Sequence, residues 1–379
     1  MSQTFYFPTR LIISDDAAAD LVSVLQDAPD AKVLLLTDSG IVGAGIAGTM
    51  IKKLEAAGFK PVVYDAVPGN PNVPDVKDAM AALKGGTATH VVALGGGSVI
   101  DTAKAVGLLL ADSDLDYEDV QWRRDTIKKG SLPVIAIPTT AGTGSETTHV
   151  AVVGDSKGFK MGVLHPALFT HTAIIDGSLM TSLPAKLTAA TGMDALVHAI
   201  EAYLGKRANM TSDLFALSTI RMVVEWLPEA YKNGGNLEAR RNMAVAAAWG
   251  GLAFDQSGLG LVHALAGPLC GTYHLHHGLG VATLLPAVLD FDAPAVTPER
   301  WEPLRAALGL PTGSNPSVMG SWAKEFLKGL DMPTGLAELE VEKDKIPAMA
   351  ESATRMAMIG INVREAGLED CKQVLEAAL

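Results

Sequence analysis

Short runs of aliphatic and β-branched residues alternate with amphipathic stretches through the first half of this chain. The apolar runs are typical of buried parallel strands, and they lie at residues 33–37, 61–64, 90–94, 134–137 and 172–175. Helical periodicity fills the intervals, at residues 47–57, 76–83 and 99–110. This alternation predicts a doubly wound, mainly parallel α/β sheet, which binds ligands beyond the carboxyl ends of its strands. Runs at 148–153 and 160–164 flank a Gly-Asp-Ser-Lys-Gly turn and predict a hairpin appended to that sheet.

The pattern changes after Leu183-Pro184. Helical periodicity then continues to the end of the sequence with almost no strand signal, and Pro184 suits the first turn of a new helix. We therefore expect two domains, an α/β domain at 1–183 and an all-α helical bundle at 184–379. Breaks between helices are expected at residues 234–235, 258–260, 311–317 and 333–335.

Composition narrows the classes of protein to consider. The chain has 379 residues, 48% of them hydrophobic and 19% charged, which is typical of a globular protein with a large core. Its net charge of −12, without a basic cluster, disfavours nucleic-acid and membrane-surface binding. We find no long apolar run and no basic, apolar leader, so we expect no membrane span and no signal peptide. Two cysteines exclude a disulfide framework and favour the cytoplasm.

A glycine-rich segment follows the strand expected at 90–94. It reads Gly95-Gly96-Gly97-Ser98 and opens the helix that carries Asp101. Glycines allow a pyrophosphate to approach the backbone closely, and a helix N-terminus offers free N–H groups. A plain tight turn between strand and helix is the alternative. The order of strand, glycines and helix favours the nucleotide-binding interpretation.

Two further loops follow predicted strands. Thr139, Thr140 and Thr143 lie in a Thr- and Gly-rich loop that would meet the same ligand, although such loops also cap helices. Asp38 ends the first main strand, where it could bind a ribose 2′-OH and repel a 2′-phosphate, favouring NAD over NADP. A helix-capping aspartate is equally consistent with that position. The G-x-G-x-x-G pattern at 43–48 begins too far beyond its strand, so we interpret it as loop and helix start.

Asp194 and His198 are separated by four residues on an otherwise apolar helix. That spacing is one helical turn and places the two Cβ atoms roughly 5–6 Å apart, which suits two ligands of one divalent metal. A hydrogen-bonded pair in the core is the alternative. Two more histidines, His263 and His277, follow on helices expected nearby. One carboxylate and three imidazoles suit iron(II) or zinc and leave room for a substrate oxygen.

Spacing alone does not decide which of His274, His276 and His277 is a ligand. We favour His277 because a histidine followed by glycine can lie at a helix start, where its ring is able to turn inward. His274 would then move protons or contact substrate. Glu201, one turn beyond His198, is a candidate hydrogen-bond partner for a metal ligand.

These segments resemble the iron-dependent, or group III, alcohol dehydrogenases. The match runs from about residue 30 to 290, with a weaker one at 362–364, and it rests on the segments 95–104, 138–146, 189–203, 258–263 and 277–278. The resemblance implies an N-terminal dinucleotide-binding domain, a C-terminal helical domain and an active site in the cleft between them. It implies Fe²⁺, or Zn²⁺ in some relatives, on Asp194, His198, His263 and His277. It also implies a homodimer.

The resemblance assigns further residues to NAD and to substrate. Those implied to contact NAD are Asp38, Asn70, Gly96, Gly97, Ser98, Thr139, Thr140, Thr148 and Lys160. Phe254 matches an aromatic position beside the nicotinamide and substrate. The family usually has a histidine four residues after His263, where this chain has Gly267. His274 or His149 would then relay the proton, or Gly267 would widen the pocket.

The expected activity is that of a metal-dependent, NAD(H)-linked alcohol dehydrogenase or aldehyde reductase. Hydride would pass between a small alcohol or hydroxy acid and nicotinamide, with the alcohol oxygen on the metal. A lyase or cyclase of the dehydroquinate synthase type is the alternative, because it shares the architecture. Such enzymes hold phosphorylated substrates with Lys and Arg, which are absent from residues 189–203 and 251–286. An inactive binding protein would have little reason to keep both the ligand set and the nucleotide loop.

Overall fold

The computed structural model describes residues 4–157 and 160–379, and it divides the chain into two compact units. The first extends to Thr140 and resumes at Gly144–Ser182. The second holds Leu183–Leu379 together with Ala141–Thr143. The sequence placed the boundary between residues 183 and 184 but did not anticipate the short excursion of 141–143 into the second unit.

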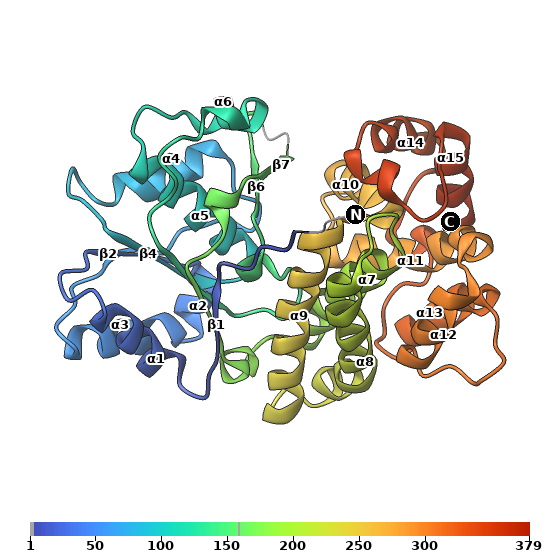
Figure 1. The fold of residues 1–379 in the computed structure, drawn as a ribbon, viewed down its shortest axis with the longest axis horizontal. Coiled ribbons are helices and arrows are strands. Elements are labelled where there is room, and N and C mark those ends of the chain that lie inside the picture. Colours follow the sequence, from blue (N-terminus) through green and yellow to red (C-terminus); the bar gives the residue numbers. More distant parts are fainter. Residues whose placement is uncertain (1–3, 158–159) are drawn as a thin grey trace. The chain divides into compact units, whose positions relative to one another are not determined.

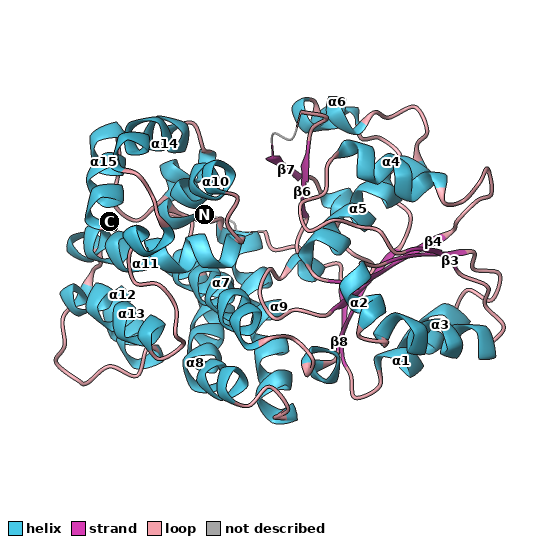
Figure 2. Ribbon diagram, turned by 180° about the vertical axis from the view of Figure 1, so that it is seen from behind, coloured by secondary structure: helices cyan, strands magenta, loops and turns pink. Residues whose placement is uncertain are grey.

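A six-stranded parallel sheet forms the centre of the first unit (Figure 2). Its strands lie in the order β1-β8-β5-β4-β2-β3. Their bounds are β1 Arg10–Ile13, β2 Val33–Leu36, β3 Val62–Tyr64, β4 His90–Gly95, β5 Val134–Pro138 and β8 Thr172–Ile175. The predicted parallel α/β sheet is therefore confirmed. Strand β1 was missed because it is a half-exposed edge strand without a continuous apolar run.

Helices cover both faces of this sheet. They are α1 Ala17–Gln26, α2 Ser39–Gly43, α3 Ile46–Ala56, α4 Val73–Ala81, α5 Gly97–Ala111 and α6 Tyr117–Trp122. Alternate side chains of β2 enter opposite layers: Leu34 and Leu36 pack with α4 and α5, whereas Val33 and Leu35 pack with α1 and α3. The predicted hairpin, β6 Val150–Gly154 with β7 Lys160–Leu164, is antiparallel but forms its own two-stranded sheet. The predicted hairpin is therefore confirmed, as a sheet separate from the main one.

The strand order creates a switch point between β2 and β4. From β2 the chain moves outward to β3 and then returns to the other side of β2 to form β4. Parallel strands end at the same edge, so the loops that begin at Thr37, Gly96 and Thr139 share one edge of the sheet. Ligands of open α/β sheets bind at such a point.

The second unit is all-helical among its described residues (Figure 1). Its helices are α7 Ala185–Leu204, α8 Met210–Lys232, α9 Leu237–Ser257, α10 Leu261–Tyr273, α11 His277–Asp292, α12 Pro298–Ala307, α13 Met319–Lys328, α14 Ile346–Thr354 and α15 Leu368–Ala377. Helix α7 is buried from Thr188 to its end because α8, α9 and α11 pack around it. Pro184 is the residue just before α7, rather than within its first turn.

One segment of the described chain, His277–Ala295, is long and apolar enough to cross a membrane by length and composition. It comprises α11 and a short extension. Of the most apolar window, 72% is buried against the rest of the protein. Burial of that extent is what the core helix of a folded domain shows, and we interpret α11 as such a helix.

Candidate active site

Three helices of the second unit bring four candidate ligands together. Asp194 and His198 lie one turn apart on α7, His263 lies in the first turn of α10, and His277 is the first residue of α11. The Oδ1 atom of Asp194 is 3.6 Å from Nε2 of His198 and 3.7 Å from Nε2 of both His263 and His277. The three imidazoles therefore surround one carboxylate oxygen.

The donor atoms of this cluster fit a metal ion. Asp194, His198 and His263 are only 3–5% exposed, yet Asp194 Oδ1 and His263 Nε2 have no hydrogen-bond partner among the residues described. Buried polar atoms are normally paired, and leaving them unpaired is costly. Ligands about 2.0–2.2 Å from zinc in tetrahedral geometry lie roughly 3.3–3.6 Å from one another. The distances from Asp194 Oδ1 to the three imidazole Nε2 atoms, 3.6–3.7 Å, are close to that range. A divalent cation would satisfy these atoms.

The electrostatics of the cluster favour a positive charge at its centre. Burial by itself would raise the pKa of Asp194, but His198, His277 and His263 together hold that pKa well below its usual range. Burial lowers the pKa of His198 to about 4, against the opposing effect of Asp194, so its imidazole stays neutral. Burial would also lower the pKa of His263, but Glu201 and Asp194 raise it to about 9. A bound cation would likewise stabilise the negative charge of Asp194.

Phe254, predicted to line the substrate site, lies beside the cluster. It projects from α9 with its ring centroid 4.5 Å from that of His198. The ring of His198 also stacks on His263 at 4.8 Å. These contacts restrict the rotation of the His198 side chain.

Of the three histidines near the end of α10, His277 is the one whose Nε2 lies 3.7 Å from Asp194 Oδ1. His274 follows α10 in the left-handed conformation, with φ 52°, and is exposed. The chain then turns so that α11 begins at His277, whose ring faces Asp194. Gly267 is exposed one turn beyond His263, and a Cβ atom there would lie 3.4 Å from Met356 Cε.

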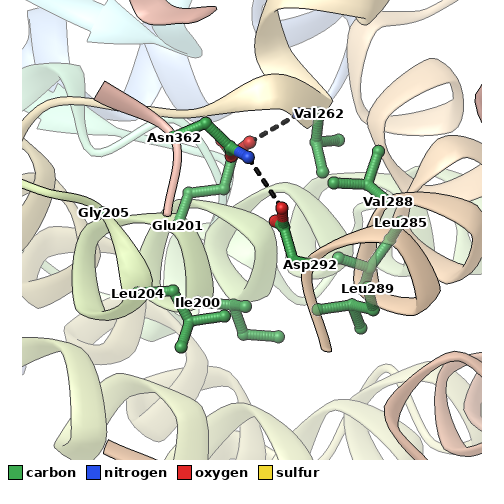
Figure 3. Close-up of a pocket in the computed structure, with 10 residues that line it drawn as sticks. All are labelled: Ile200, Glu201, Leu204, Gly205, Val262, Leu285, Val288, Leu289, Asp292 and Asn362. Carbon is green, nitrogen blue, oxygen red and sulfur yellow. Dashed lines mark hydrogen bonds between the residues drawn. The ribbon is translucent and has the colours of Figure 1, made fainter. Parts of the chain in front are cut away.

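Glu201 contacts a candidate ligand, but not the one nearest in sequence. Its Oε2 is 2.5 Å from His263 Nδ1, and its Oε1 accepts a hydrogen bond from Val262 N at 2.7 Å. Asn362 and Asp292 lie next to it around a cavity of ≈ 10 Å³, room for about one water molecule (Figure 3). The cavity is too small for a substrate. Sequence reasoning missed both residues, although the weak match at 362–364 was a signal for Asn362.

The glycine loop of the first unit has the backbone form expected for binding a phosphate. A Cβ atom on Gly95 would lie 2.5 Å from Val99 Cγ2, and one on Gly96 would lie 3.3 Å from Thr140 Oγ1. Gly96 precedes α5 and caps it without a side chain, so the first N–H groups of α5, from Gly97 and Ser98, lack a side-chain acceptor among the described residues. A side chain at Gly95 would overlap Val99 of α5, and one at Gly96 would crowd Thr140 in the neighbouring loop.

Four of the predicted cofactor residues lie at the same edge of the sheet: Asp38, Asn70, Ser98 and Thr139. Ser98 Oγ donates to Gly69 O at 2.7 Å, which joins the exposed loop of Asn70 to the start of α5. Asp38 caps α2, since its Oδ1 accepts from Gly40 N at 2.8 Å and Ile41 N at 3.0 Å. Thr139 Oγ1 is buried and has no partner in the part of the chain that the structure describes.

Asp101 and Thr148 take part in hydrogen bonds that hold the Thr-rich loop in place. Asp101 accepts from Ser145 Oγ at 2.5 Å and from Val152 N at 3.0 Å. Lys104 is fully buried and donates to the carbonyl oxygens of Ser145 at 2.6 Å and Thr148 at 2.9 Å. Sequence reasoning missed this lysine, because an isolated Lys in an amphipathic helix ordinarily points to solvent.

The remaining predicted residues are not brought to either cluster by a described contact. Thr143 belongs to the excursion that joins the second unit. His149 lies in the first unit with its ring centroid 5.4 Å from that of Phe169. Lys160 begins β7, and its side chain lies outside the described part of the structure. Their roles stay predictions.

Comparison with known proteins agrees with this architecture. The profile of the iron-containing alcohol dehydrogenases matches residues 8–177, and that of the C-terminal region of the same family matches residues 188–379. This chain belongs to the iron-containing alcohol dehydrogenase family. The predicted family and enzyme class, an alcohol oxidoreductase, are therefore confirmed.

Its relatives cover the whole chain. The NAD-dependent methanol dehydrogenase of Bacillus methanolicus is 35% identical over 383 residues, which cover 99% of each chain. The alcohol dehydrogenase structure from Oenococcus oeni superposes with a TM-score of 0.94 at 29% identity, covering 100% of both chains. A 1,3-propanediol oxidoreductase structure gives a TM-score of 0.92 at 30% identity over 100% of both. Both structures share the two-part fold described above.

Proposed function

We propose that this chain is an NAD(H)-linked, metal-dependent alcohol dehydrogenase that also reduces the matching aldehydes. The observation that carries the proposal is that the Nε2 atoms of three imidazoles lie 3.6–3.7 Å from one buried carboxylate oxygen, Asp194 Oδ1. Relatives named for methanol and 1,3-propanediol support a small alcohol as the substrate. A hydroxy acid or its aldehyde is the wider class.

Asp194, His198, His263 and His277 are the residues that would hold Fe²⁺ or Zn²⁺. The bound cation supplies a Lewis acid, which lowers the pKa of an alcohol or polarises a carbonyl group. The protein keeps the donor atoms ready for it. Glu201 holds the proton of His263 on Nδ1, which leaves Nε2 free to face Asp194. Phe254 covers one side of His198 and keeps water from that side.

The switch point of the first unit is the proposed binding site for NAD. Gly96, Gly97 and Ser98 would present backbone N–H groups to the pyrophosphate. Asp38 caps α2 with Oδ1, so Oδ2 is the oxygen proposed to accept from a ribose hydroxyl. The other residues proposed for this site are Asn70, Thr139, Thr140, Thr143 and Lys160, with Asp101 and Thr148 holding the loop.

The hydroxyl proton of the alcohol has to reach solvent during oxidation. We propose His274 and His149 for its transfer, because Gly267 carries no group that could do so. His274 is supported by its exposure and its position three residues before His277. We also propose a cytoplasmic homodimer, supported by family resemblance and by a content of only two cysteines.

A panel of small alcohols and aldehydes, assayed with NAD and NADP, tests this proposal. We expect net accumulation of NADH with at least one primary alcohol and consumption of NADH with its aldehyde. A lyase or cyclase would use NAD without net reduction. Failure to change the NADH concentration with any substrate, in a metal-loaded sample that binds NADH, would refute the proposed activity.

A further inference from the structure

Helix α10 is capped at its N-terminus by side chains from other parts of the chain. Leu261 N donates to Asn362 Oδ1 at 3.0 Å, and Val262 N donates to Glu201 Oε1 at 2.7 Å. The N-cap residue, Gly260, has no side chain that could take either bond. The first N–H groups of a helix have no acceptor within the helix, so these two bonds fix where α10 begins.

Glu201 joins this cap to the candidate metal ligand on α10. While Oε1 accepts from Val262 N, Oε2 accepts from His263 Nδ1 at 2.5 Å. One buried carboxylate therefore sets both the backbone position and the ring orientation of His263. A carboxylate is also stabilised by the positive end of the helix dipole. As a result, Nε2 of His263 points toward Asp194 Oδ1, 3.7 Å away.

Asn362 is itself held in one orientation. Its Nδ2 donates to Asp292 Oδ1 at 2.7 Å (Figure 3). The same Nδ2 donates to Arg364 O at 3.0 Å, which leaves Oδ1 to face Leu261 N. Both Asp292 and Asn362 are buried. The fit is close, because a Cβ atom on Gly260 would lie 2.6 Å from Asn362 Oδ1. The asparagine therefore has little freedom to move away from α10.

From these contacts we infer that Asn362, oriented by Asp292, is a positioning residue for the metal ligand His263. It acts through the start of α10 and touches neither metal nor substrate. The inference rests on the metal site proposed above. The segment that contains Asn362, 101 residues after Leu261 in the sequence, would then help to position a ligand of that site.

Metal affinity and ligand geometry test this inference without an activity assay. We would measure the Zn²⁺ dissociation constant by competition with a chelator, and the visible absorption of the Co²⁺-substituted protein. Asn362→Ala should weaken Zn²⁺ binding roughly 10- to 100-fold, the range for partners of metal ligands, and should shift the Co²⁺ bands.

Asn209→Ala is the matched control. Asn209 caps α8 by accepting from Thr211 N and Ser212 N, but α8 carries no candidate ligand. It should lose a similar helix-cap stability, about 1 kcal/mol, with unchanged Zn²⁺ affinity. An N362A protein with wild-type affinity and Co²⁺ bands would overturn the inference, as would an equal loss in N209A.

A second variant tests the role of Asn362 if N362A is unstable. If N362A does not fold, Asp292→Ala replaces it, because the amide of Asn362 is then free to turn. That variant should lose about tenfold in Zn²⁺ affinity, and wild-type affinity would overturn the inference. If Asp194→Asn binds Zn²⁺ as the wild type does, or if the wild type binds none, then the proposed metal site is wrong. That result would refute the metal site itself and not the role of Asn362.

Discussion

Asp194 Oδ1 and His263 Nε2 lie 3.7 Å apart, and neither has a hydrogen-bond partner within the described residues. Asp194→Asn should therefore leave the fold intact but weaken metal binding by at least about 100-fold, since removing a ligand costs more than removing its support. Metal content after dialysis and the NADH-linked rate measure this. Asp78→Asn, on the exposed side of α4, is the control and should retain both. An Asp194→Asn protein that keeps stoichiometric metal would show that the carboxylate is not a ligand.

Gly278→Ala should damage the site through packing alone. A Cβ atom at Gly278 would overlap the carbonyl oxygen of Ala190, where α11 packs against α7. Relieving that overlap requires the start of α11, including His277, to shift. We expect a loss of roughly 1–3 kcal/mol in the free energy of unfolding and weaker metal binding.

Gly271→Ala is the matched control for this variant. A Cβ atom on Gly271 would have no described atom within 4 Å, and Gly271 also lies in a helix. It should be neutral or stabilising by up to about 1 kcal/mol. Urea unfolding and Zn²⁺ titration of both variants compare them. Equal behaviour of the two alanines would contradict the close contact at Gly278.

The sequence predicted the parts of this molecule that depend on local pattern. Apolar runs predicted five of the six strands of the main sheet, and the spacing of Asp194 and His198 predicted a shared helix face. Contacts between distant segments were not predictable in this way. Asn362 accepts a hydrogen bond from Leu261 N, 101 residues away in the sequence. Lys104 donates to the backbone oxygen of Ser145, and no local sequence pattern brings these two residues together. The sequence left open whether Asp38 caps a helix or binds a ribose, because its carboxylate can accept hydrogen bonds from either the backbone or a ligand.

The stability of the first unit should depend on pH through Glu146. Burial raises the pKa of this carboxyl to about 7, against the opposing effect of Lys104. Because the folded pKa exceeds the unfolded value of 4.5, protonated Glu146 stabilises the fold below about pH 4.5, and this contribution is lost as the pH rises through 7. The change is at most about 3 kcal/mol.

Glu146→Gln should remove that dependence. The neutral amide has nearly the same size, so the free energy of unfolding should fall less between about pH 5 and 7 than in the wild type. Urea titrations at several pH values measure the slope. Glu55, which is exposed on α3, provides the control as Glu55→Gln. Equal slopes in the wild type and E146Q would contradict a raised pKa for Glu146.

Coenzyme preference should depend on Asp38. Its carboxylate lies at the carboxyl end of β2, where it would repel the 2′-phosphate of NADP. Asp38→Ser keeps an oxygen that can cap α2 but removes the charge, so kcat/KM for NADP should rise roughly tenfold relative to NAD, about 1.4 kcal/mol. Asp30→Ser, an exposed aspartate before β2, should leave the ratio unchanged. An unaltered ratio in D38S would place the ribose elsewhere.

Removal and return of the metal test the central claim most directly. The protein would be stripped with a chelator under anaerobic conditions and then titrated with Fe²⁺ or Zn²⁺, with NADH formation from a primary alcohol measured at each step. We expect turnover to disappear with the metal and to return at one equivalent per chain, and we expect H263A to recover little of it. Full turnover in a rigorously metal-free protein would show that the metal is not needed for the reaction.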